Sequence, residues 1–119
     1  MLDKKARIRT SREYRNVFEK GKRLSGRFLI IYYVENALDN NRFGFITNKK
    51  IGMAVIRNRI KRQLRAIVRE YQGQVKNKHD IVLVARAGIG KSSFEGMEKD
   101  YIAIMKKAGL FARNANKID

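Results

Sequence analysis

The run KKIGMAVIRNRIKRQLRAIVREY, residues 49–71, carries the strongest structural signal in the chain. Apolar residues recur in it every three or four positions and fall within about 120° of a helical wheel, which is typical of a helix with one buried side. We predict a helix from Met53 to Tyr71 that ends near Gly73. Its apolar side is formed by Ile56, Ile60, Leu64, Ile67, Val68 and Tyr71.

The opposite side of this helix is basic and almost free of acids. Glu70 is the only acidic residue in it, whereas helices charged for solubility usually pair Glu with Lys or Arg. Several of the cations lie in the first half, where the dipole is positive and each terminal charge costs roughly 0.3–1 kcal/mol. A docked phosphate backbone would offset this cost, because phosphates bind helix N-termini and arginine. A solvated charged face is the alternative, but we favour nucleic-acid binding by the side that holds Arg57, Asn58, Arg59, Lys61, Arg62, Arg65 and Arg69.

The composition of the chain also favours a nucleic-acid partner. The 119 residues include 28 Lys or Arg and 11 Asp or Glu, a net charge of +17 that a polyanion partner would relieve. The basic residues concentrate in residues 4–27 and 40–69, and the second segment contains no acid. This distribution predicts a basic surface and not a uniformly basic protein.

The chain length predicts one domain over residues 1–119, with flexible ends at 1–8 and 110–119. Apolar runs long enough to span a membrane are missing, and no apolar stretch follows the first residues, so we expect neither a membrane helix nor a secretory signal. The absence of cysteine excludes disulfides and fits a reducing compartment, the cytoplasm.

Two further helices are predicted from capping boxes, in which Ser or Thr precedes Glu by three residues. The first starts at Thr10 and ends near Gly21, with Tyr14, Val17 and Phe18 on its apolar side. The second starts with the box at residues 92–95 and closes at Gly109.

Four strands complete the pattern. Residues 27–35 are β-branched and aromatic, and residues 42–47 follow after an Asp-Asn-Asn turn, so we predict that they pair as antiparallel neighbours. Residues 80–86 are continuously apolar, which is typical of a central strand buried on both faces. Residues 22–25 form a weaker edge strand. The predicted fold is α+β, a single-domain α-β-β-β-α-β-α sandwich with helices packed on a four-stranded sheet.

Protein-based catalysis has little support in the sequence. His79 is the only histidine and is predicted to be a surface or loop residue, and Glu95, Glu98 and Asp100 are predicted to be solvated. The segment Ala85–Ser92 approaches a phosphate-binding loop but has Ala85 in place of the first Gly, and the 27 residues after it offer no second strand. A nucleotide hydrolase is therefore a minor alternative to a glycine-rich turn before a capped helix.

The run from Lys49 to Arg65 resembles the RNR signature of the bacterial ribonuclease P protein component, K-x-G-x-A-V-x-R-N-R-x-K-R-x-x-R. The resemblance extends to the aromatic helix near the N-terminus, to the strand containing RFLIIY and to the strand containing IVLVAR, but not to the tail after Gly109. It implies the α-β-β-β-α-β-α fold with a left-handed β-α-β crossover, which the usual right-handed rule would not predict.

The resemblance also implies a function, maturation of the 5′ end of transfer RNA. The catalyst would be an RNA subunit that uses Mg²⁺, with no metal held by the protein and no obligate protein partner. The protein would bind that RNA through Arg57, Asn58, Arg59, Lys61, Arg62, Arg65 and Arg69. It would bind the 5′ leader of precursor transfer RNA through Tyr14, Phe18, Tyr32, Lys49 and Lys50, where Tyr14 replaces an expected Phe.

Spacing alone favours a core role for Tyr14 and Phe18 over base stacking, and the resemblance raises the stacking role above it. The main alternative function is a ribosomal-type or other RNA-binding protein with no catalytic partner. A membrane-surface role is a weaker alternative, since the apolar side of the long helix is needed for the core.

Overall fold

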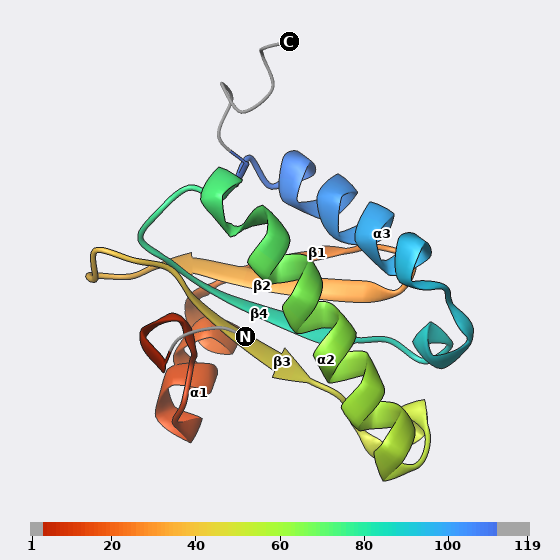
Figure 1. Cartoon of the computed structure of the whole chain (residues 1–119). Coiled ribbons are helices and arrows are strands. Elements are labelled where there is room, and N and C mark those ends of the chain that lie inside the picture. Colours follow the sequence, from red (N-terminus) through yellow and green to blue (C-terminus); the bar gives the residue numbers. More distant parts are fainter. Residues whose placement is uncertain (1–3, 112–119) are drawn as a thin grey trace, which may run out of the picture.

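The computed structural model describes residues 4–111 and shows a four-stranded sheet between two helical layers (Figure 1). The chain order α-β-β-β-α-β-α predicted from the sequence is confirmed, with short 3₁₀ turns between elements. No helix in the described part of the chain could span a membrane. The main elements are α1 (Ser11–Lys20), β1 (Lys22–Ser25), β2 (Leu29–Glu35), β3 (Arg42–Ile46), α2 (Ala54–Tyr71), β4 (His79–Ala85) and α3 (Phe94–Lys107).

The strand order β1-β2-β4-β3 corrects one prediction. β2 and β3 are not neighbours: β4 lies between them, antiparallel to β2 and parallel to β3. The reason is that β4 is apolar on both faces and is fully buried only in an inner position. In Figure 1, β3 and β4 both run to the right, α2 lies in front of them and β4 lies above β3, so the crossover through α2 is left-handed.

The sheet separates two apolar clusters. α2 and α3 cover the face formed by Leu29, Ile31 and the alternate residues of β4, and this is the larger core. α1 covers the other face, where Val17 packs with Val82 and Ile8. The alternation of β2 predicted from the sequence therefore places its two sides against different helices.

Capping side chains determine where α1 and α3 begin. The box at Thr10 is present as predicted: its side chain accepts from the Glu13 N–H at 3.1 Å, and Glu13 accepts from the Thr10 N–H at 3.1 Å. The box predicted at residues 92–95 does not form in α3: Ser93 is the N-cap and accepts from the Gly96 N–H at 2.9 Å, and Gly96 has no side chain to complete a box.

Asp100 is not the solvated carboxylate that the sequence suggested. It accepts the backbone N–H groups of Arg27, Phe28 and Leu29 at 2.9–3.0 Å and so fixes the start of β2 to α3. Gly26 makes this approach possible, since a Cβ at that position would lie 2.4 Å from Asp100 Oδ1. Glu98 is also engaged, as it accepts the Tyr71 hydroxyl at 2.7 Å.

Replacing Asp100 with alanine is expected to lower the free energy of unfolding by about 2–3 kcal/mol, because three backbone N–H groups lose a charged acceptor. Urea denaturation of the two proteins measures the change. Lys99→Ala, at an exposed neighbouring position, should alter stability by less than about 0.5 kcal/mol. Equal small effects of both substitutions would show that Asp100 does not anchor β2.

The two predicted flexible ends are only partly within the described residues. Residues 4–6 form a 3₁₀ turn and Ile8 is buried against α1, because Arg7 forms a bridge with β3 at Phe43. At the other end Leu110 is buried and Phe111 pairs with Val75. The remaining positions of that prediction, 1–3 and 112–119, lie outside the described residues.

Candidate nucleic-acid interface

The basic side of α2 faces away from the core, as its periodicity predicted. Ile60, Leu64, Ile67 and Val68 are buried, whereas the cations between them are exposed or half-buried. The N-terminus of α2 has no side-chain cap and no acid in its first turn, and its N-cap residue, Met53, is 70% exposed. The backbone N–H groups and the arginines therefore present positive potential on one side of the helix.

Two arginines of this side are held by the protein itself. Arg57 Nη1 donates to the Gly52 carbonyl at 2.8 Å, and Arg59 Nη2 donates to the Gly90 carbonyl at 2.9 Å. Each guanidinium keeps further donors for an anion, because arginine carries five N–H groups. These contacts attach the start of α2 to the loop before it and to the loop after β4.

The remaining cations are not neutralised. Within residues 4–111, Lys61, Arg62 and Arg69 make no ion pair or hydrogen bond with another side chain. Arg65 stacks its guanidinium over the Phe45 ring, 5.7 Å from the centroid. A row of unpaired cations on a rigid helix can bind successive phosphates without first breaking internal salt bridges.

Two shallow hollows flank these cations and share Arg65. One, of about 260 Å³, lies along α2 between Arg62 and Arg69. The other, of about 150 Å³, lies at the edge strand β3, where Lys61 and Arg65 of α2 meet Arg7 and Tyr14. The basic side of α2 thus continues around β3 toward α1.

Tyr14 connects α1 to that edge. Its ring lies against Gly44 of β3 so closely that a Cβ at Gly44 would be 2.5 Å from Tyr14 Cε1. Burial raises the pKa of the Tyr14 hydroxyl, and the Phe45 backbone and the Arg65 charge oppose the rise, so the hydroxyl is neutral at physiological pH. Tyr14 therefore packs on the sheet and also lines the hollow, and base stacking by its ring stays a prediction.

Phe18 and Tyr32 form an aromatic pair in which Phe18 is exposed and Tyr32 is half-buried. Their rings meet edge to face with centroids 4.8 Å apart, and Phe18 is 37% exposed. Phe18 projects from the end of α1. Tyr32 lies on the face of β2 that α1 covers. Such a platform can stack unpaired bases beside the basic residues of α1.

Lys49 and Lys50 lie apart from these aromatic residues. They form an exposed 3₁₀ turn past the carboxyl end of β3, near the start of α2, whereas α1 lies toward the other end of the sheet (Figure 1). The structure therefore joins the two lysines to the N-terminus of α2 and separates them from Phe18 on α1.

The sequence did not identify the ion-pair network that holds α1 to the sheet. Arg42 donates to both oxygens of Asp80, at 3.0 and 2.7 Å, and to Glu13 at 2.8 Å. Asp80 is only 2% exposed. The hydrogen bond from the Arg9 N–H is the main cause that lowers the pKa of Glu13, and Arg42 adds to it; the bond to Asp80 raises the pKa of Arg42. The signal for this network in the sequence was Arg42 itself, an arginine at an inward-facing position of a predicted strand.

Neither a metal centre nor a phosphate loop is built from the described residues. In residues 4–111, no three His, Asp or Glu side chains gather as possible ligands of a metal ion. The loop after β4 is tied internally, since the Ser92 hydroxyl donates to the Ile89 carbonyl at 2.7 Å and Gly90 accepts from Arg59. His79 begins β4 and its Nδ1 lies 3.0 Å from the Asn77 carbonyl oxygen. The basic side of α2, in contrast, is suited to binding and positioning a polyanion.

Comparison with known proteins agrees with this reading. The family model described as Ribonuclease P matches residues 2–109. The ribonuclease P protein component of Alkaliphilus metalliredigens is 34% identical over 106 residues, which cover 89% of this chain and 96% of that protein. The component of a Thermoanaerobacter species is 35% identical over 114 residues, or 96% and 98% of the two chains.

Solved structures show the same architecture. The RNase P protein of Staphylococcus aureus matches with a TM-score of 0.84 at 26% identity, covering 89% of this chain and 97% of the other. The RNase P protein of Thermotoga maritima matches with a TM-score of 0.78 at 27% identity, covering 85% and 96%. The overall fold is therefore shared across these proteins.

Proposed function

This chain belongs to the ribonuclease P protein family and is a protein subunit of ribonuclease P, and we propose from this that it assists removal of the 5′ leader from precursor transfer RNA. In this proposal one surface binds the catalytic RNA subunit and another binds the leader. The observation that carries it is the basic side of α2, where exposed cations have no acidic partner among the described residues.

We assign binding of the RNA subunit to the α2 surface. Arg62, Arg65 and Arg69 follow one another at helical spacing along the hollow of about 260 Å³, which suits a phosphate backbone lying along the helix. Arg57 and Arg59 would hold the helix start and its neighbouring loop in place while their free N–H groups bind the RNA. Asn58 is exposed between them.

The chemistry is assigned to the RNA subunit. This assignment is supported by the charge of the candidate surface, which is cationic and suits phosphate groups better than a Mg²⁺ ion. The protein would contribute by neutralising phosphates and by orienting the leader relative to the RNA.

The leader is assigned to the aromatic platform of Phe18 and Tyr32, with Tyr14 and the basic edge at β3 beside it. Base stacking on a ring is worth about 1–3 kcal/mol per base and tolerates any sequence. A surface of this kind would bind leaders of different sequence, which a general processing enzyme requires.

Binding to RNA separates this function from its main alternative. We expect the chain to bind a bacterial ribonuclease P RNA more tightly than a ribosomal RNA fragment of equal length, with affinity falling steeply as salt rises. Filter binding with each labelled RNA over a salt series measures this. Equal affinity for the two RNAs would instead support a ribosomal-type RNA-binding protein.

Phe18→Ala is expected to weaken binding of precursor transfer RNA to the assembled holoenzyme by about 5- to 150-fold, the loss of one stacked base. Binding of mature transfer RNA, which has no leader, should change little. Competition binding with both substrates gives the two affinities. An equal loss for precursor and mature RNA would remove the leader assignment.

A further inference from the structure

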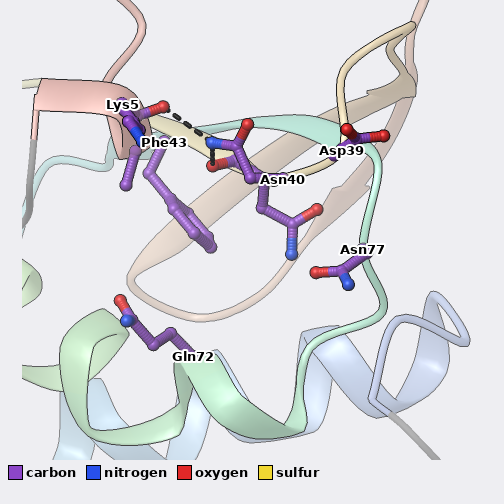
Figure 2. Close-up of a pocket in the computed structure, with 8 residues that line it drawn as sticks. Lys5, Asp39, Asn40, Phe43, Gln72 and Asn77 are labelled. Carbon is purple, nitrogen blue, oxygen red and sulfur yellow. Dashed lines mark hydrogen bonds between the residues drawn. The ribbon is translucent and has the colours of Figure 1, made fainter.

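A polar pocket of about 390 Å³ lies where the β2–β3 connection meets the end of α2 (Figure 2). Its walls come from segments far apart in the chain: the N-terminal turn, the β2–β3 connection, the end of α2 and the segment before β4. Figure 2 shows the Phe43 ring between Asn40 on one side and Gln72 on the other, with Asn77 across the opening. None of the functions above uses this pocket.

The pocket is lined by amides and carries no net charge. Lys5 and Asp39 balance each other on the rim, so the pocket lacks the positive excess that a phosphate site requires. The other polar side chains are the amides of Asn40, Asn41, Gln72 and Asn77. A neutral ligand with several hydrogen-bonding groups fits this lining better than an anion.

One amide is fixed and has unused donors. Asn41 is only 9% exposed, and its Oδ1 accepts the His79 N–H at 2.8 Å, which orients the side chain. Its Nδ2 makes no hydrogen bond with residues 4–111. The exposed amides of Gln72 and Asn77 can supply the complementary acceptor. Phe43 is only 2% exposed and forms the floor of the pocket, so the amide donors and acceptors, and not a stacked ring, would read the edge of an unpaired base.

The pocket also adjoins the basic surface. Phe43 lines both this pocket and the hollow formed by Lys61 and Arg65. Gln72 follows Arg69 by three residues at the end of α2, so the two lie on adjacent parts of the helix surface. A strand whose phosphates bind α2 can therefore place a neighbouring base here.

We propose that this pocket binds one extruded, unpaired base of the RNA that α2 holds, with adenine preferred because an Asn or Gln amide pairs with its donor and acceptor edge. The proposal rests on the proposed RNA-binding function and adds a base-reading site to it. The phosphates of the same strand would stay on the basic residues next to the pocket.

The test uses the full chain labelled with ¹⁵N and titrated with AMP, and separately with ribose 5-phosphate, which has the phosphate without the base. AMP should shift the side-chain amide resonances of Asn41, Gln72 and Asn77 in a saturable way, and ribose 5-phosphate should not. Gln72→Ala and Asn77→Ala, both at exposed positions, should each weaken AMP binding about fivefold, the effect of one lost hydrogen bond. Asn16→Ala on α1 is the matched amide control and should leave AMP binding unchanged.

Two results would overturn the proposal: amide resonances that respond equally to ribose 5-phosphate, or resonances that do not respond to AMP. Precursor cleavage by the same protein with the RNA subunit is measured in parallel. Stimulated cleavage together with silent amides would reject only the base pocket. Failure to stimulate cleavage would reject the proposed function itself.

Discussion

Replacing Arg62 and Arg69 together with glutamine is expected to lower affinity for ribonuclease P RNA by about 25- to 60-fold at about 0.1 M salt. Each phosphate contact contributes about 0.7–0.9 to the slope of log K against log salt, so the double variant should lose about 1.4–1.8 from that slope. Both side chains are exposed and unpaired within the described residues, so their removal should leave the fold intact. Filter binding over a salt series measures both quantities.

The matched control removes the same two charges elsewhere. Lys106 and Lys107 are exposed at the end of α3, and their double replacement by glutamine should reduce affinity far less. Equal losses for the two double variants would show that net charge alone governs binding. The α2 surface would then lose its assignment.

Arg42→Met is expected to lower the free energy of unfolding by about 3–5 kcal/mol, a large part of the 5–15 kcal/mol of a typical domain. The substitution leaves Asp80 buried with only Asn36 as a side-chain donor, and it also releases Glu13 from the sheet. Because this network holds α1, the aromatic platform should become mobile as stability falls. Urea denaturation gives the first effect, and precursor binding gives the second.

A second substitution keeps this prediction testable if the single variant unfolds. Adding Asp80→Asn to Arg42→Met removes the uncompensated buried charge and should recover part of the lost stability. Arg23→Met, at an exposed position on the edge strand β1, should change stability by less than about 0.5 kcal/mol. A loss for Arg42→Met as small as that for Arg23→Met would contradict the anchoring role.

The sequence predicted the elements well because each has a local cause. The period of α2, the capping box at Thr10 and the apolar run of β4 lie within single segments, and the structure confirms all three. The pairing of strands has no such local cause. The connection between β2 and β3 would permit a hairpin. β4 nevertheless lies between these two strands, because burying both of its apolar faces requires a covering layer on each side and a neighbouring strand at each edge.

Polar contacts between residues far apart in the chain were also not predicted from the sequence. Asp100 was predicted to be a solvated helix residue, yet it binds backbone groups more than 70 positions away along the chain. Arg42 and Asp80 belong to neighbouring strands whose register the sequence did not reveal. For the candidate site, the row of cations was predictable from helical spacing, whereas the hollow joining Tyr14 to Lys61 and Arg65 depends on how α1 and α2 pack around β3.

Cleavage of a labelled precursor transfer RNA at low Mg²⁺ tests the central claim most directly. Three reactions contain this protein alone, a bacterial ribonuclease P RNA alone, and the two together. We predict that cleavage at the mature 5′ end occurs only in the combined reaction, or is far faster there than with the RNA alone. The protein alone should give no cleavage. No gain on mixing while the protein still binds RNA would contradict the account, and so would cleavage by the protein alone.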